Sequence, residues 1–203
     1  MLFIGDTHGK FRPLRKICAA VAPKKCIQLG DMGLGFGMDY DFPNCENLSF
    51  IRGNHDSPKV CRNTSSFLGD FGYLEKEDIF FVSGAFSVDK RFRTIGRDWW
   101  EDEELSYEQW ERVHKLYEEH KPKIVITHGC PYRMISSICG NPIRSITATG
   151  LDALLNIHQP EIWVFAHFHI FKTITEEKTL FVALGELDVW DSDTRKKISV
   201  LGH

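Results

Sequence analysis

The chain has 203 residues, of which 42% are hydrophobic and 26% are charged, and its formal net charge is -3. This length and composition are typical of a globular protein with a sizeable core, and we expect a single domain over residues 1–203. The small negative charge excludes a strong overall attraction to nucleic acid, and the sequence shows no clear nucleic-acid patch. No apolar run approaches the roughly 18 residues that a membrane span needs, so we expect no membrane segment.

Short apolar runs alternate with helical patterns along the chain. Apolar side chains recur every three or four residues between Lys10 and Val21, which predicts a helix that ends before Pro23. A second helix is predicted to begin after Ser106, because Gln109 stands three residues later and the two form a capping box. Runs rich in β-branched and aromatic residues predict buried strands. These runs cover residues 2–4, 26–29, 48–52, 79–86, 123–127 and 162–165.

The remaining segments predict loops, a short helix and further strands. Residues 33–43 are rich in glycine and aspartate and are typical of a loop. A short helix is expected from Thr149 or Gly150 to His158. The tail over residues 171–200 predicts successive strands, with turns near 176–178 and 191–193. Helix–strand alternation followed by strands favours an α/β fold with two packed sheets and helices outside them.

The six cysteines and the first residues indicate the compartment. The sequence holds no C-x-x-C pair, so we expect no zinc ribbon, and several cysteines lie in apolar runs as small core residues. The opening residues carry neither a basic segment nor a long apolar one, so we interpret them as a strand rather than a signal peptide. These features favour a reducing, cytoplasmic location.

Polar motifs follow five of the predicted strands directly. Because sites in α/β sheets collect at the carboxyl ends of strands, we expect these motifs to meet at one edge. Oxygen and imidazole ligands without thiolates suit Mn, Fe, Zn, Ni or Co, and seven candidates are about right for two ions. The motifs are Asp6-Thr7-His8, Gly30-Asp31, Gly53-Asn54-His55-Asp56, His128-Gly129 and His167-Phe168-His169.

This ligand set suits phosphate chemistry. Two divalent ions, two carboxylates and a bridging hydroxide leave a charge of about +1, which favours an anionic phosphoryl group. Paired ions about 3.5–4 Å apart lower the pKa of bound water and stabilise the attacking and leaving oxygens. His55 lies beside the ligand Asn54 and is the expected general acid, with Asp56 as a candidate to orient it.

Each motif alone also fits a plain structural role. Asp-x-His-Gly and Gly-Asp are common in turns, and Asn-His-Asp suits a loop. The ordered conjunction of five motifs, each at the end of a predicted strand, favours a metal site. His114, His120 and His158 fall in helical or loop positions and are interpreted as surface residues.

Together the motifs resemble those of the calcineurin-like metallophosphoesterase superfamily, especially its small bacterial and phage-type members. The resemblance runs from residue 6 to residue 169. It implies a four-layer α/β/β/α sandwich, in which two mixed β-sheets are flanked by helices, and a dinuclear metal centre. Manganese is the expected cofactor, and iron, zinc, nickel or cobalt also suit the site.

The resemblance also implies a role for each candidate residue. His55 would be the catalytic histidine. The seven metal ligands would divide between two ions. The ligands of the first ion would be Asp6, His8 and His169. The ligands of the second ion would be Asn54, His128 and His167, and Asp31 would bridge the two.

Departures from the family pattern bear on the substrate. Protein phosphatases of the superfamily carry Asp-Arg-Gly after the second motif, where this chain has Leu34-Gly35-Phe36. The last motif has Ala166 before its first histidine and Phe168 between its two histidines, where the family usually has glycine and a small residue. Serine/threonine protein phosphatase activity is therefore disfavoured, and the ligand spacing is retained.

The insertion over residues 87–93, with Trp99 and Trp100, is the strongest lead to the substrate. Arg91, Arg93 and Arg97 could bind phosphate, and the tryptophans could stack on a base or ring. Alternatively, the tryptophans are core or cover residues, and the arginines form ion pairs with acidic residues of 101–104.

We therefore expect a metal-dependent phosphoesterase, either a phosphatase or a phosphodiesterase. A metal-bridging hydroxide would attack a small phosphorylated substrate, with a nucleotide as one candidate. The alternatives are a serine/threonine protein phosphatase and a non-catalytic scaffold of the same fold. The scaffold is disfavoured because His55 and every ligand are present.

Overall fold

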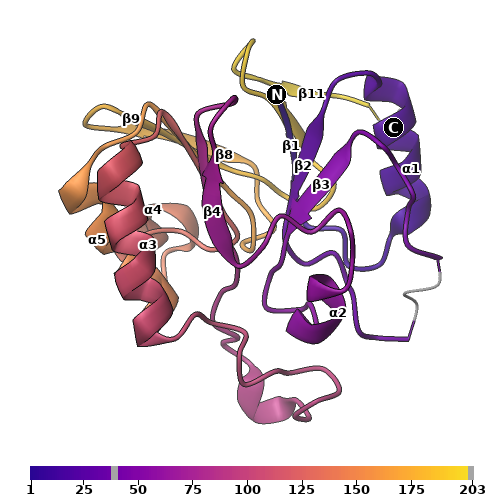
Figure 1. Cartoon of the computed structure of the whole chain (residues 1–203), viewed down its shortest axis with the longest axis horizontal. Helices are drawn as coiled ribbons and strands as arrows, with labels where there is room; N and C mark the ends of the chain where they lie inside the picture. The colour runs from indigo at the N-terminus through magenta and orange to yellow at the C-terminus, as the bar shows by residue number, and fades with distance from the viewer. Residues whose placement is uncertain (38–40, 201–203) are drawn as a thin grey trace.

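Two β-sheets lie between two groups of helices in the computed structural model, which describes residues 1–37 and 41–200 (Figure 1). The first sheet has five strands in the order β11-β10-β1-β2-β3, and the second has six in the order β4-β5-β6-β7-β9-β8. The strands of the first sheet are β1 (Leu2–Ile4), β2 (Cys26–Leu29), β3 (Leu48–Ile51), β10 (Val189–Asp191) and β11 (Lys196–Ile198). Those of the second are β4 (Phe71–Leu74), β5 (Ile79–Val82), β6 (Ile124–Thr127), β7 (Ile162–Phe165), β8 (Lys172–Glu176) and β9 (Thr179–Ala183).

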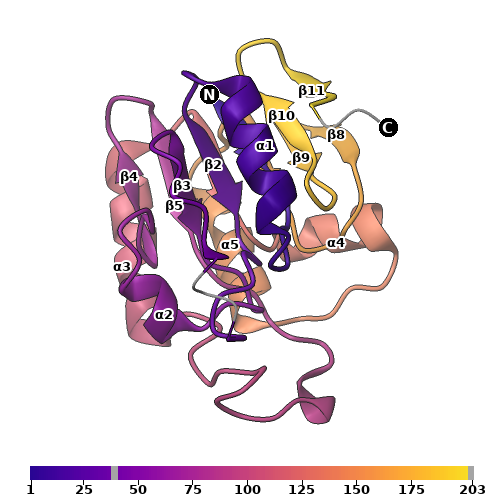
Figure 2. The same ribbon diagram turned by 90° about the vertical axis from the view of Figure 1, so that its right-hand side faces the viewer.

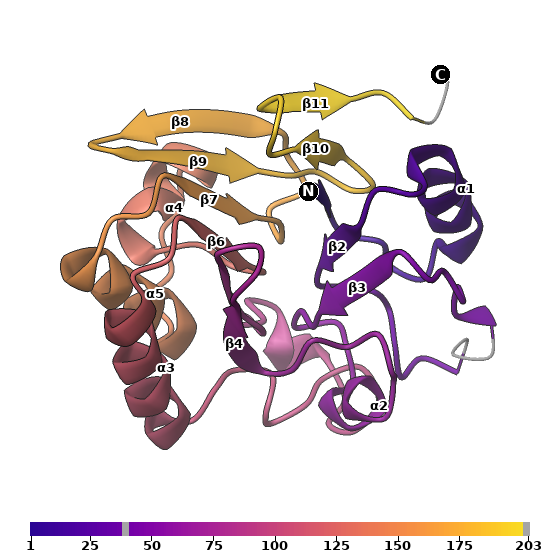
Figure 3. The same ribbon diagram turned by 45° about the horizontal axis from the view of Figure 1, so that its top comes forward.

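The helices cover the outer faces of the two sheets. In Figure 2, helix α1 (Phe11–Val21) lies over the first sheet, and the short helix α2 (Pro58–Arg62) lies at the lower left, beyond the ends of the strands. Helices α3 (Tyr107–His120), α4 (Tyr132–Cys139) and α5 (Ile146–Ile157) lie on the side of the second sheet in Figure 3. These four layers confirm the predicted α/β/β/α sandwich. Within the described ranges, no helix is long and apolar enough to cross a membrane.

Strand alternation divides the core into three apolar layers. On β7, Trp163 and Phe165 pack with residues of α3, α4 and α5, whereas Ile162 and Val164 pack with residues of the first sheet. On β1, Phe3 joins the layer between the sheets, while Leu2 and Ile4 face α1. Successive side chains of a strand point to opposite faces, so each of these central strands supplies two layers.

The parallel strands of both sheets have their carboxyl ends at the same edge of the molecule. Strands β1, β2 and β3 are mutually parallel, as are β5, β6, β7 and β9. The loops that carry the predicted ligands follow β1, β2, β3, β6 and β7. Their convergence therefore follows from the strand directions.

The structure also corrects several boundaries. Helix α5 begins at Ile146, because the Ser145 hydroxyl accepts a hydrogen bond from Ala148 N and caps the helix earlier than predicted. Strand β5 ends at Val82, since the chain then turns at Gly84, whose φ is +89°. The capping box at Ser106 is confirmed. The prediction missed α2, α4 and β4. The predicted loop over residues 33–43 includes residues 38–40, which lie outside the described ranges.

Candidate metal centre and adjoining cavity

The predicted ligands come together in two groups at the carboxyl edge of the sheets. Within each group, one nitrogen or oxygen atom per residue lies within 4.8 Å of the others. Asn54 adds to the second group, because its Oδ1 lies 3.1 Å from Nε2 of His128. The first group is Asp6, His8 and His169, and the second is Asp31, His128 and His167.

The Asp31 carboxylate lies between the two groups. Its Oδ1 is 3.2 Å from Nε2 of His128, and its Oδ2 is 3.8 Å from Nε2 of His8. The backbone N–H of His55 donates to Oδ1 at 2.8 Å and holds the carboxylate in place. Each oxygen of one buried side chain thus faces a different group, which is the position a bridging ligand needs.

The donor atoms fit divalent cations. Oδ2 of Asp6 is buried and accepts no hydrogen bond within the described part of the chain. The Nε2 atoms of His8 and His169 lie only 3.1 Å apart. Asp6 Oδ2 also lies 3.3 Å from Nε2 of His169, so one carboxylate oxygen and two imidazole nitrogens converge on one point. A shared cation would fit between them, and their oxygen and nitrogen chemistry suits Mn, Fe, Zn, Ni or Co.

Burial and neighbouring charges shift the pKa values of the candidate ligands. Burial raises the pKa of Asp6 to about 7, although His128 opposes this shift. Burial alone would lower the pKa of His128, but Asp31 and Asp6 raise it to about 9. Burial lowers the pKa of His167 to about 3, which leaves its imidazole neutral, as metal ligation requires.

Backbone contacts fix which nitrogen of His128 faces the centre. Its Nδ1 lies 2.7 Å from the carbonyl oxygen of Leu29, so this nitrogen carries the proton and donates it. Nε2 is then the nitrogen that faces Asn54 and Asp31, and it would supply the lone pair to a cation once its own proton is displaced. A carbonyl that orients a histidine in this way is a common support for metal ligands.

A hydrogen-bonded chain orients Asn54. Its Nδ2 donates to the Ser87 hydroxyl at 3.0 Å, and that hydroxyl donates to the Glu103 carboxylate at 2.5 Å. The same carboxylate accepts the Ser87 backbone N–H at 2.9 Å. Because the amide nitrogen of Asn54 is occupied, its Oδ1 is left facing His128. No local pattern predicted this role for Ser87 and Glu103, and residues 101–104 entered the sequence analysis only as alternative ion-pair partners of the arginines.

Asp56 binds the ligand loops to each other rather than orienting His55. Its carboxylate accepts backbone N–H groups on both sides of the centre, at 2.7–3.1 Å. These donors are Met32, Gly33, Leu34 and Gly53. Asp56 is fully buried, so the loop after β2 is fixed to the loop after β3.

The ligand loops are tight and partly strained. A Cβ on Gly30 would lie 2.5 Å from Nδ1 of His128, and one on Gly53 would collide with the Asp31 carboxylate. Ligand candidates themselves adopt the left-handed region, which costs energy for residues other than glycine. They are His8, Asp31, His167 and His169, with φ between 47° and 71°.

His55 faces the insertion rather than Asp56. Nη2 of Arg93 lies 2.6 Å from its Nε2, and Nη1 lies 3.3 Å from its Nδ1. Asp89 holds the same guanidinium at 2.8 Å. Burial lowers the pKa of His55, and Arg93 adds to this shift while Asp31 opposes it.

Other residues that the sequence analysis singled out lie away from the metal centre. Arg91 is exposed and lies over the Phe92 ring, 4.6 Å from its centroid. Trp100 packs against Phe36, with ring centroids 5.5 Å apart, so it acts as a cover residue. The ring nitrogens of His114 and His158 contact backbone carbonyls, which makes them structural.

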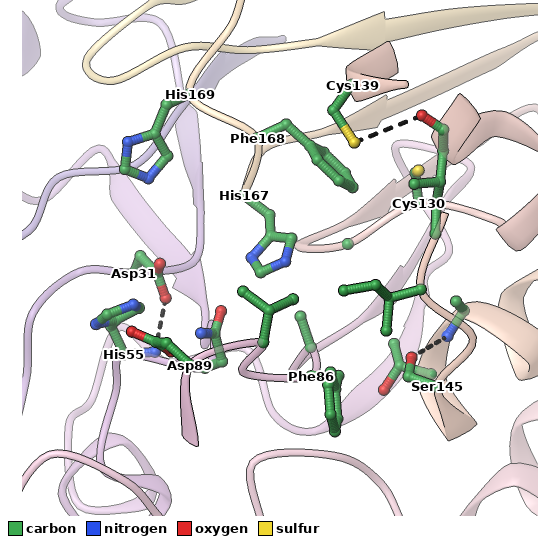
Figure 4. A pocket seen from close by; sticks show the side chains of 18 of the residues that line it. Asp31, His55, Phe86, Asp89, Cys130, Cys139, Ser145, His167, Phe168 and His169 are labelled. Carbon is green, nitrogen blue, oxygen red and sulfur yellow. Dashed lines mark hydrogen bonds between the residues drawn. The ribbon is translucent and has the colours of Figure 1, made fainter. Parts of the chain in front are cut away.

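A cavity of about 480 Å³ opens beside the centre. In Figure 4, Asp31 and His55 lie at one end, Cys130 and Ser145 lie at the other, and His167 lies between them. Asn54, Arg93 and His169 also line it. The cavity therefore leads from the ligand groups toward α4 and α5.

Comparisons with known proteins identify the family and the fold. The family model described as calcineurin-like phosphoesterase matches residues 1–171. A dimetal phosphatase from Danio rerio superposes with a TM-score of 0.58 at 12% identity, over 92% of this chain and 88% of that one. GAP50, described as the anchor in the inner membrane complex of Plasmodium, gives a TM-score of 0.55 at 12% identity, over 91% of this chain and 71% of that one.

A third structure is a putative 5'-nucleotidase from Staphylococcus aureus, solved in complex with alpha-ketoglutarate. Its TM-score is 0.54 at 13% identity, over 98% of this chain and 52% of that one. Similarity at this level of identity shows a shared fold. No curated protein sequence matches this chain.

Proposed function

This chain belongs to the calcineurin-like phosphoesterase family, and from that membership we propose that it hydrolyses a small phosphomonoester or phosphodiester with two divalent cations. The observation that carries the proposal is the position of Asp31, whose two carboxylate oxygens face the two ligand groups. Manganese is the proposed metal among those that this ligand set accepts.

The seven ligands have distinct surroundings. Asp6 and His128 are fully buried, whereas His169 has a side chain that is 51% exposed. Asp31, Asn54 and His167 of the second group and His169 of the first line the cavity, so both groups face the space in which a substrate would bind. When bound, the cations would lower the pKa of a coordinated water and neutralise charge on the phosphoryl oxygens.

Two further residues complete the proposed site. Arg93 lies at the rim of the cavity with its guanidinium on His55, so it can donate to a phosphoryl oxygen placed there. His55 is the proposed proton donor to the leaving oxygen. An anionic phosphoryl group beside the imidazole would favour its protonated form, which opposes the lowering of the pKa by burial and Arg93.

A serine/threonine protein phosphatase is the weaker proposal. The segment that would carry the Asp-Arg-Gly motif contains Leu34, which is buried, and Phe36, which packs on Trp100. Neither side chain supplies a carboxylate for His55 or a cation for phosphate. A non-catalytic scaffold of the same fold is the other alternative, and it predicts a folded protein that retains no metal.

A substrate panel with metal replacement tests the proposal. Purified protein loaded with each divalent metal in turn is assayed on p-nitrophenyl phosphate, its bis ester and a phosphoserine peptide. The proposal predicts turnover of an aryl ester that exceeds turnover of the peptide and depends on added metal. Failure of a folded, metal-loaded sample to hydrolyse any of the three would contradict it, and a clear preference for the peptide would favour the protein phosphatase.

A further inference from the structure

The cavity beside the metal centre changes character along its length. Among the residues that the structure describes, the Asp, Glu, Lys and Arg side chains that line it are Asp31, Asp89 and Arg93, and all lie with His55 at the metal end. Beyond them the lining contains no Asp, Glu, Lys or Arg within the described ranges. A group that extends from the metal centre therefore leaves a charged region and enters an uncharged one.

Apolar side chains from four segments form the uncharged part. Figure 4 shows Phe168 and Phe86 on opposite sides of the space, with Cys130 at its far end. Ile135 of α4 and Ala148 of α5 are buried residues that add to the same wall. Apolar lining of this kind favours a ligand with apolar surface, because that surface is removed from water on binding.

Phe168 shows that the uncharged part of the cavity lies where the leaving group of a substrate would be. It stands between the predicted ligands His167 and His169, and its ring lies 5.0 Å from the His167 ring. A phosphoryl group at the two ligand groups would thus have its ester substituent beside Phe168. The uncharged part of the cavity then has room for that substituent, and its lining offers no partner for a second charged group.

We propose that the chamber formed by Phe86, Ile135, Ala148 and Phe168 binds the leaving group of the substrate, which is an uncharged, ring-sized apolar alcohol. This inference rests on the proposed phosphoester hydrolysis. It excludes substrates whose leaving group carries charge, because burying an unpaired charge in this chamber would be costly.

Matched aryl phosphates test the substrate class. Phenyl phosphate, 2-naphthyl phosphate and phosphotyrosine share a phenolic leaving oxygen and differ in the size and charge of the remainder. Each further buried CH2 contributes about fourfold to binding, so we expect kcat/KM to be at least tenfold higher for the naphthyl ester than for the phenyl ester. Phosphotyrosine, with its charged end, should not exceed the phenyl ester.

Two isoleucine variants provide the matched control. Ile143 lines the cavity and Ile95 does not, and their exposed fractions are 41% and 57%, so both tolerate a polar residue. Ile143→Asp should remove the preference for the naphthyl ester, and Ile95→Asp should keep it. Binding of 2-naphthol to protein without added metal is measured by the fluorescence of the naphthol. Its affinity should fall at least tenfold in Ile143→Asp and should stay unchanged in Ile95→Asp.

The outcomes separate the two proposals. Turnover that is equal on all three esters, or 2-naphthol binding that is the same in both variants, overturns the chamber assignment and leaves phosphoester hydrolysis standing. Absence of turnover on every ester, with 2-naphthol binding lost only in Ile143→Asp, overturns the proposed hydrolysis and supports the chamber as a binding site.

Discussion

The Ser87 hydroxyl accepts a hydrogen bond of 3.0 Å from the side-chain amide of Asn54. Glu103 in turn binds both the hydroxyl and the backbone N–H of Ser87, and it is 3% exposed. The long connection between β5 and α3 therefore orients the candidate metal ligand Asn54 through hydrogen bonds. Residues that are not themselves candidate ligands can thus set the direction of Asn54 Oδ1.

Ser87→Ala should weaken metal binding without unfolding the protein. The substitution frees the Asn54 amide to rotate, and loss of a support of this kind typically costs about 10- to 100-fold in metal affinity. Titration calorimetry of Mn²⁺ into metal-free protein measures the change. Ser136→Ala, at an exposed position of α4, is the control. Equal affinities in the two variants would show that Ser87 does not position Asn54.

His55→Ala should lower turnover while metal content stays near that of the wild type. General acids contribute roughly 10²–10⁴-fold, and they matter most when the leaving oxygen is basic. We therefore expect a larger loss on phenyl phosphate than on p-nitrophenyl phosphate. Steady-state kinetics on both esters, with metal analysis of the same samples, measure the effect. Loss of metal in this variant would identify His55 as a ligand or structural residue instead.

Arg93→Ala should lower kcat/KM on small phosphoesters, and Arg91→Ala should not. A hydrogen bond to a charged group contributes roughly 1.5–3 kcal/mol, which corresponds to a loss of about 10- to 150-fold. Arg91 is exposed over Phe92, so it provides a control with the same change of charge on the same insertion. If the two variants lose activity equally, the insertion acts through its overall charge rather than through Arg93.

Asp70→Asn should destabilise the fold in a pH-dependent way. Burial would raise the pKa of Asp70, but Arg52 and Arg62 hold it below its ordinary value. Because the folded pKa lies below the unfolded one, the stabilisation is complete above the unfolded pKa of about 4 and is lost as pH falls through the folded value. We expect a loss of about 2 kcal/mol at pH 7, within the roughly 1.5–3 kcal/mol of a hydrogen bond to a charged group.

Urea unfolding of the wild type and the variant between pH 7 and pH 3 measures this difference. It should shrink toward the acid end. Asp102→Asn is the control, since Asp102 pairs with Arg62 at the surface and its side chain is 56% exposed. That variant should lose no more than about 1 kcal/mol. A difference between Asp70→Asn and the wild type that grows on acidification would contradict the sign assigned here.

The sequence predicted every sheet strand except β4, and it predicted the ligand motifs, because both depend largely on local patterns. Apolar runs that end in Asp, Asn or His identify a strand and its carboxyl end together. Local signals for two missed helices were also present. Ser57 precedes Pro58 at the start of α2, and Gly140 follows α4 in the left-handed region with φ of 78°.

Other features depend on contacts between distant segments and have no local pattern. Glu103 is a buried support although it lies in an acidic run, because Ser87 and Arg52 meet it in three dimensions. Asp56 follows His55 directly, yet its carboxylate points to the loop after β2. The cavity is likewise formed by side chains that are far apart in the sequence.

Metal content of the wild type and Asp31→Asn, measured after loading with Mn²⁺ and removal of free metal, tests most directly whether Asp31 is shared by two cations. The account predicts two ions per wild-type chain and no more than one in the variant, with both proteins folded by circular dichroism. Two ions retained in Asp31→Asn, or fewer than two in the folded wild type, would contradict it.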